Sequence, residues 1–113
     1  MTAAGRDILA MGAAAVLIKG GHLTTERSPD VYLSPDEQVV LDGPRYPYEV
    51  HGSGCCLAAT ITAYLARGET LPDACRQGKV FVSDAIRHAV PALSGRRMIN
   101  PGNMVPDKPP QYR

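Results

Sequence analysis

The sequence lacks any concentration of charge. Its 12 lysine and arginine residues are balanced by 11 acidic residues, which leaves a net charge of +1. No run of like charges is longer than two residues, as in Arg96-Arg97. Proteins that bind nucleic acids or membrane surfaces carry a basic patch or stripe that attracts phosphates. The balance of charge therefore argues against both kinds of partner.

Cysteine is also scarce, and long hydrophobic runs are missing. The three cysteines, Cys55, Cys56 and Cys75, make an odd number, and the adjacent pair has poor geometry for a disulfide. We therefore expect a reducing, cytoplasmic location. The cysteines and the nearby His22 and His51 match no common zinc spacing, so no metal site is predicted. No apolar stretch reaches the roughly 20 residues that a membrane-spanning helix needs.

Hydrophobic periodicity predicts an α/β chain built from short elements. Residues 3–11 have a helical pattern that Gly12 ends. Residues 15–18 form an unbroken apolar run, typical of a central strand that is buried on both faces. Residues 30–33 and 38–41 are strand-like and flank a turn that contains proline, so they predict a hairpin at one side of that strand.

The second half of the chain predicts two helices. Apolar residues recur at helical spacing from Cys55 to Arg67, and Gly68 is the expected stop. Thr70 has the position of an N-cap for the next helix, which should continue to about Val90 and end at Pro91.

The chain reads as one domain with a tail. Residues 94–113 are rich in proline and glycine and poor in large apolar side chains, which predicts a poorly anchored segment. Residues 1–93 hold all the expected helices and strands. The sheet they form is small and leaves an edge unpaired, so we expect a homodimer or pairing with a complementing chain.

A glycine-rich loop, His51-Gly52-Ser53-Gly54-Cys55, leads directly into the first helix of the second half. Its glycines let backbone N–H groups turn inward and let a ligand approach closely. The start of the helix adds unsatisfied donors and the positive end of its dipole, which suit a phosphate or a developing anion. An ordinary turn is the alternative, because Gly-x-Gly is common at such junctions.

Three motifs follow one another along the chain. They are Ala15–His22, which ends in Lys-Gly-Gly-His, then Ser28-Pro29-Asp30, and then the glycine loop with the alanine-rich helix after it. Together they resemble the C-terminal half of hydroxymethylpyrimidine/phosphomethylpyrimidine kinases, which are members of the ribokinase-like superfamily. The resemblance covers about residues 3–93. It implies a partial ribokinase-like fold, a Rossmann-like three-layer arrangement with a small sheet, a β-hairpin and packed helices.

The resemblance also implies a reaction. Kinases of this family use ATP and Mg²⁺ to phosphorylate 4-amino-5-hydroxymethyl-2-methylpyrimidine, and then its monophosphate, in thiamine biosynthesis. The backbone of Gly52, Ser53, Gly54 and Cys55 would be the anion hole, which agrees with the need of phosphoryl transfer for stabilisation of negative charge. Cys55 would also be the catalytic base, a thiolate at a helix N-terminus that accepts the proton of the substrate hydroxyl.

Three further residues are implied on the nucleotide side. Lys19 matches the lysine of the family's Val-x-x-Lys-Gly-Gly-His motif, and Gly21 belongs to the same turn. Lys79 corresponds to a helix lysine that lies near the nucleotide in relatives. A solvated surface lysine is the alternative for Lys79, because most lysines on helices are exposed.

Three hypotheses about function follow from the sequence. The chain is the catalytic C-terminal part of a kinase, or a truncated remnant that binds a nucleotide without turnover, or an interaction domain that pairs through its sheet edge. Within the enzyme class, pyridoxal kinase activity is the second possibility, because relatives with the same cysteine loop accept a similar ring alcohol.

Overall fold

The computed structural model describes residues 2–20, 29–44, 46, 50–91 and 96–104. In chain order, its elements are α1 (Thr2–Ala10), β1 (Val16–Ile18), β2 (Asp30–Leu33), β3 (Gln38–Leu41), β4 (Val50–His51), α2 (Ser53–Ala66), α3 (Leu71–Arg87), β5 (Val90–Pro91), β6 (Arg97–Met98) and the 3₁₀ helix η1 (Pro101–Met104).

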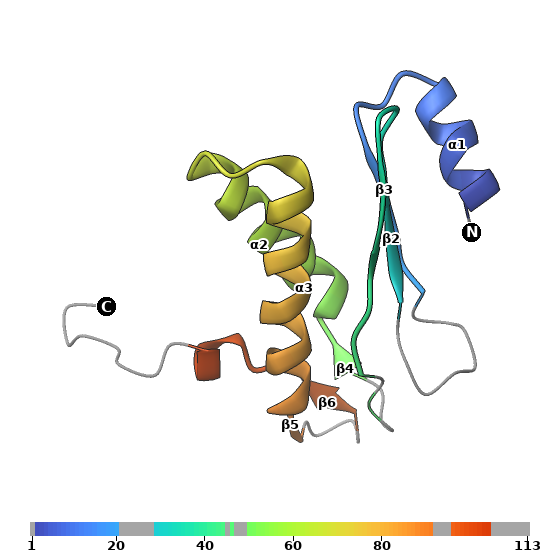
Figure 1. Cartoon of the computed structure of the whole chain (residues 1–113). Helices are drawn as coiled ribbons and strands as arrows, with labels where there is room; N and C mark the ends of the chain where they lie inside the picture. Colours follow the sequence, from blue (N-terminus) through green and yellow to red (C-terminus); the bar gives the residue numbers. More distant parts are fainter. Residues whose placement is uncertain (1, 21–28, 45, 47–49, 92–95, 105–113) are drawn as a thin grey trace.

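The elements form three layers (Figure 1). Helix α1 covers one face of the sheet that β1, β2 and β3 form, and the antiparallel pair α2 and α3 lies on the other side. The α/β class and the layered arrangement expected from the sequence are confirmed. None of the helices in the described ranges combines the length and apolar character needed to cross a bilayer.

Strands β2 and β3 form the predicted hairpin. Their bounds are the predicted ones, and the backbone N–H of Ser34 donates to the carbonyl of Glu37 at 2.9 Å to close the turn. The Ser34 hydroxyl accepts hydrogen bonds from the amides of Asp36 and Glu37. A serine that bonds its own turn in this way explains why this part of the fold is readable from local sequence.

The prediction of a central strand buried on both faces is wrong for β1. Within the described residues, β1 pairs only with β2, in antiparallel register, so it stands at the edge of the sheet. Its three residues are half-buried. The strand buried along its whole length is β2, because β2 has a neighbouring strand on each side and helices over both faces.

Alternation along the strands supplies two apolar faces. Leu17, Tyr32 and Val39 stand beside one another in the register and pack with Cys75 of α3. On the opposite face, Gly5 of α1 lies so close to apolar side chains of β1 and β2 that a Cβ atom would overlap them. The small residue therefore lets α1 sit directly on the sheet.

A short turn joins helices α2 and α3, and its capping residue is the one that the sequence predicts. Thr70 is the N-cap of α3, and its hydroxyl accepts a hydrogen bond from the amide of Asp73 at 3.4 Å. Helix α3 ends at Arg87, earlier than the predicted Val90, because Val90 and Pro91 pair with β6 as strand β5. Proline is tolerated there because the strand lies at a sheet edge.

Part of the predicted tail is anchored. Residues 97–98 form β6, which runs parallel to β4 and antiparallel to β5 in a second small sheet. The amide of Asn100 donates to the carbonyl of Ala85 at 3.1 Å, and η1 packs against α3. The expectation of poor anchoring is therefore corrected for residues 96–104, whereas 105–113 lie outside the described residues.

Candidate functional site

The glycine loop ends at the start of α2, as the sequence predicts. Gly52 is the N-cap residue, with φ of 96° and ψ of −1°, which is the left-handed region that favours glycine. The first helical hydrogen bond runs from the amide of Cys56 to the carbonyl of Gly52 at 3.0 Å. No side chain caps the helix.

Three backbone donors are therefore left at this end of α2. Within the described part of the chain, the amides of Ser53, Gly54 and Cys55 donate no hydrogen bond to another residue. They lie in the first turn, where the helix dipole is positive and where negative charge is stabilised by about 0.3–1 kcal/mol at an exposed site. The loop thus offers an anion both charge and hydrogen-bond donors.

The loop is braced by the segment that follows β6. The carbonyl of His51 accepts a hydrogen bond from the amide of Ile99 at 3.3 Å, and the Ile99 side chain lies over Gly52. Asn100 in turn is bonded to α3 through Ala85. Sequence reasoning missed this support, because it depends on a parallel pairing of β4 with β6 between residues far apart in the chain.

The adjacent cysteines have different surroundings. Cys55 is exposed in the first turn of α2, whereas Cys56 is half-buried with its Sγ 3.9 Å from the hydroxyl of Thr60. Cys75 lies in the core, and burial raises the pKa of its thiol above the usual value of 9.0. Cys55 is therefore the thiol that the fold presents at the mouth of the loop.

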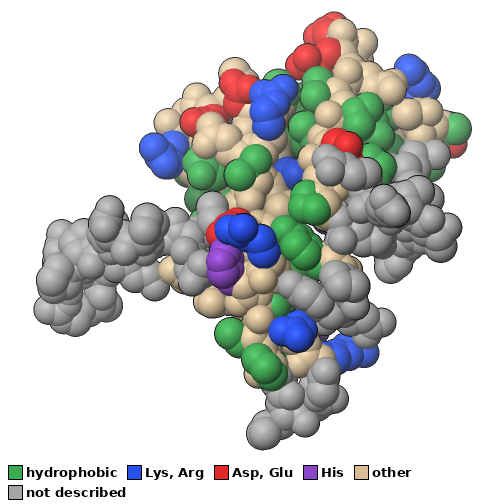
Figure 2. Space-filling view, turned by 60° about the horizontal axis from the view of Figure 1, so that its bottom comes forward, with side chains coloured by type: hydrophobic (Ala, Val, Ile, Leu, Met, Phe, Trp, Pro, Cys, Tyr) green, Lys and Arg blue, Asp and Glu red, His purple; other side chains and the backbone are tan. Residues whose placement is uncertain are grey.

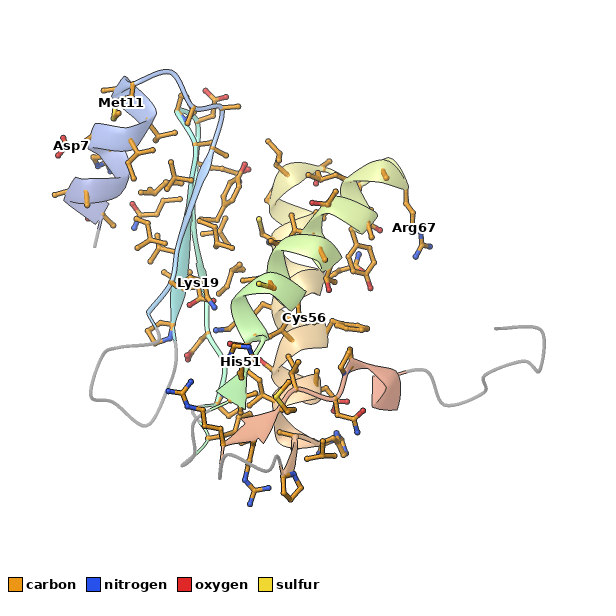
Figure 3. All side chains as sticks on the ribbon, turned by 180° about the vertical axis from the view of Figure 1, so that it is seen from behind. Asp7, Met11, Lys19, His51, Cys56 and Arg67 are labelled. Carbon is orange, nitrogen blue, oxygen red and sulfur yellow. The ribbon has the colours of Figure 1, made fainter. Side chains whose placement is uncertain are left out.

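A second cluster joins β2 to α3 and to the end of β1. The carboxylate of Asp30 is almost fully buried, at 1% exposed. It accepts hydrogen bonds from the amide of Gly20 at 2.9 Å and from the Nζ of Lys79 at 2.9 Å, and the Nζ of Lys19 lies 3.8 Å away. Lys19 and His51 lie toward the same end of the molecule, where α2 begins (Figure 3).

The structure excludes the alternative given for Lys79 and adds Asp30 to the cluster. Lys79 is not a solvated lysine, since its side chain is only 12% exposed. The sequence does not identify Asp30 as a site residue, yet its side chain lies beside both lysines. The signal was present in the pattern, because Asp30 is a charged residue that shares a strand face with the core residue Tyr32. Gly21 lies outside the described residues.

A pocket of about 330 Å³ opens beside Lys79, between the end of β3 and α3. Gly43 forms part of its wall, and a Cβ atom there would stand 3.1 Å from Cε of Lys79, so the glycine leaves room for the lysine stem. The pocket is lined by Asp42, Gly43, Pro44, Tyr46, Lys79, Val80, Ser83, Asp84 and Arg87.

A larger groove of about 440 Å³ lies over α2 and α3, away from the lysines. Its walls are mostly apolar, and they include Cys56, Tyr64, Arg67, Phe81 and Pro101. The space-filling view shows exposed apolar side chains spread among charged ones (Figure 2). Because the groove holds neither the loop amides nor the paired lysines, its size does not make it the candidate site.

The described residues do not form a metal centre. No group of three or more His, Cys, Asp or Glu side chains within them stands close enough to hold a metal ion. The oxygens of Asp30 are already bonded to Gly20 and Lys79. These residues therefore do not fit Mg²⁺.

The layered fold and the site together define a class of protein. The chain is similar to the pyridoxal kinase of Staphylococcus aureus in complex with AMP-PCP and pyridoxal, with a TM-score of 0.89 and 31% identity. The similarity covers 96% of this chain and 41% of that one. The fold is that of the ribokinase-like kinases, with the glycine loop at the start of a helix.

The family follows from sequence comparison. The family described as phosphomethylpyrimidine kinase matches residues 1–100, and this chain belongs to it. It is 38% identical over 86 residues to the hydroxymethylpyrimidine/phosphomethylpyrimidine kinase of Escherichia coli strain K12. It is 36% identical over 101 residues to the thiamine biosynthesis bifunctional protein ThiED of Geobacter sulfurreducens.

The chain matches only part of each relative. The alignment with the Escherichia coli kinase includes 75% of this chain and 32% of that protein, and the one with ThiED includes 88% and 21%. The chain thus spans about a third or less of these relatives.

Proposed function

We propose that this chain carries the phosphate-transfer side of a cytoplasmic phosphomethylpyrimidine kinase. The reaction is the ATP-dependent phosphorylation of 4-amino-5-hydroxymethyl-2-methylpyrimidine and of its monophosphate, in thiamine biosynthesis. The observation that carries the proposal is the set of three first-turn amides, Ser53, Gly54 and Cys55, that have no partner within the described residues. Membership of a kinase family supports a phosphate as the anion they hold.

The residues of the site have separate tasks in this proposal. The amides from Gly52 to Cys55 stabilise the negative charge that spreads over the phosphoryl group during transfer. The exposed thiol of Cys55, as thiolate, accepts the proton of the substrate hydroxyl. On the nucleotide side, Lys19 and Gly21 face the phosphates, whereas Lys79 stands at the wall of the adjacent pocket and is bonded to Asp30. Mg²⁺, which the family resemblance implies, would be held by groups other than the described residues.

The proposal includes a further polypeptide. Because the chain spans about a third of the Escherichia coli kinase, the pyrimidine pocket is supplied by another segment, a complementing chain or a second copy in a homodimer. Within the described residues β1 pairs on one side only, which supports this proposal, since an edge strand offers backbone groups for pairing.

The test compares the two adjacent cysteines. We expect Cys55→Ala to lower pyrimidine-dependent formation of ADP by at least about 100-fold, the usual contribution of a general base. Cys56→Ala is the matched control and should retain activity within about threefold, because Cys56 faces Thr60 instead of the loop mouth. Equal activity of Cys55→Ala and wild type would remove the proposed base.

Nucleotide binding is tested separately from turnover. Calorimetry should show ATP binding that weakens about tenfold in Lys19→Ala, the loss expected for one charge-assisted hydrogen bond. Binding without any ADP formation would favour a nucleotide-binding remnant over a kinase. The absence of ATP binding would contradict both.

Pyridoxal phosphorylation is the second candidate activity. It is favoured by the likeness to pyridoxal kinases, including the Bacillus subtilis enzyme in an ADP complex at a TM-score of 0.83 and 31% identity. Rates of ADP formation with the pyrimidine and with pyridoxal, measured side by side, decide between the two substrates.

A further inference from the structure

Asp30 is the most deeply buried charged side chain among the described residues. A buried carboxylate is costly unless cations and hydrogen-bond donors surround it. Asp30 has both, because Lys79 reaches one of its oxygens and the Gly20 amide reaches the other. The carboxylate therefore depends on α3 for its charge balance.

The two lysines near Asp30 differ in distance and exposure. Lys79 is within hydrogen-bond distance, at 2.9 Å, and its side chain is 12% exposed. Lys19 stands at 3.8 Å, beyond hydrogen-bond distance, and its side chain is 47% exposed. Loss of Lys79 would leave a buried charge without its close partner, whereas movement of Lys19 would not.

We infer that Asp30 gives the two lysines different roles: Lys79 is the fixed counterion of Asp30, and Lys19 is a releasable cation that moves to a phosphate of the nucleotide. This inference rests on the proposed function, because it deepens the role of the same site. Asp30 is then a positioning residue. It also fixes the turn that carries Lys19, since the Gly20 amide follows Lys19 directly and is bonded to the carboxylate.

The space at Gly43 supports the fixed role of Lys79. The Lys79 stem passes close to Gly43, where even a Cβ atom would press against Cε. A side chain held along its stem and bonded at its tip has little freedom to follow a ligand. Lys19 has no such confinement, because nearly half of its side chain is in solvent.

The first arm of the test measures stability by thermal unfolding. Lys79→Met should lower the unfolding midpoint by several degrees, because Asp30 loses its close cation. Adding Asp30→Asn to that variant should restore most of the loss, since the asparagine still accepts from Gly20 and carries no charge. Lys19→Met is the matched control and should leave the midpoint within about 2 °C of wild type. Failure of the double variant to recover would overturn the counterion role.

The second arm measures ATP affinity by calorimetry. Lys19→Met should weaken binding about tenfold. The double variant Asp30→Asn/Lys79→Met should bind ATP within about threefold of wild type, although it also lacks one lysine. If it loses as much affinity as Lys19→Met, Lys79 contacts the nucleotide directly and the division of roles is wrong.

The third arm follows lysine acetylation by mass spectrometry. In the ligand-free chain Lys19 should react and Lys79 should be protected, and ATP should protect Lys19 as well. Rapid acetylation of Lys79 in the folded wild type would contradict its fixed role. A wild-type chain that binds no ATP would contradict the proposed function and the release of Lys19 to a phosphate, while the stability and labelling arms would still decide the counterion role.

Discussion

Gly52 is the residue on which the geometry of the loop depends. Its φ of 96° is rarely adopted by residues with a side chain, and a Cβ atom there would stand 3.2 Å from the Ile99 side chain. We expect Gly52→Ala to lower the free energy of unfolding by about 1–3 kcal/mol. Urea unfolding measures the change.

Gly54 is the matched control for that substitution. A Cβ atom at Gly54 meets nothing within 4 Å, and the residue already has helical conformation in α2. Gly54→Ala should therefore keep or raise the free energy of unfolding, by up to about 1 kcal/mol. Equal destabilisation by the two variants would show that the left-handed turn does not set the start of α2.

Cys75 and Tyr32 make stability depend on alkaline pH. Burial raises the pKa of Cys75 above 9.0 and, as the main cause, that of Tyr32 above 10.0. Between the ordinary and the raised pKa the unfolded chain has lost a proton that the folded chain keeps, so stability falls as the pH rises above about 9.

The measurement is the urea midpoint at pH 7.5, 9 and 10.5. The wild type should lose stability across this series, and Cys75→Ala should lose less, because only Tyr32 then contributes. Identical slopes in the two proteins would exclude the buried thiol as a cause.

At the scale of elements, the close approach of α2 and α3 depends on Gly78. A Cβ atom at this position would stand 2.9 Å from Ile61 and 3.3 Å from Leu57 of the facing helix. We expect Gly78→Ala to destabilise the chain by about 1–3 kcal/mol, although alanine is the better helix former by about 1 kcal/mol. Val80→Ala in the same helix should change stability by less than about 0.5 kcal/mol, because Val80 is 62% exposed.

The elements that the sequence predicted correctly are those whose turns and caps depend on hydrogen bonds between residues close in the chain. Ser34 closes the hairpin turn and Thr70 caps α3, and both interactions join residues close in the chain. The second sheet could not be predicted, because β4 and β6 are separated in the chain by α2 and α3 and no local pattern indicates their pairing. For the same reason, the sequence does not predict the contact of Ile99 with the glycine loop.

The candidate site residues show the same difference between local interactions and contacts across the chain. The glycine loop and Cys55 lie together in one motif, so their common place at the start of α2 followed from sequence. The bond between Asp30 and Lys79 joins β2 to a helix late in the chain. The strand pattern places Asp30 on the same face as Tyr32, but no sequence spacing indicates that Lys79 is its partner.

For the whole molecule, the prediction concerns assembly. One side of β1 is an open edge within the described residues, and the chain spans about a third of the Escherichia coli kinase. We expect light scattering at micromolar concentration to give twice the mass of the single chain. A monomer under these conditions would contradict the homodimer and leave a complementing chain as the partner.

The most direct test of the central claim is the response of the loop amides to a phosphate ligand. In ¹⁵N-labelled protein titrated with ATP, the amide signals of Ser53, Gly54 and Cys55 should move most and saturate together. Those of Gly12, which follows α1, and of Gly68, which follows the opposite end of α2, should stay in place. Saturable ATP binding that leaves the three loop amides unmoved, or no binding at all, would contradict the account.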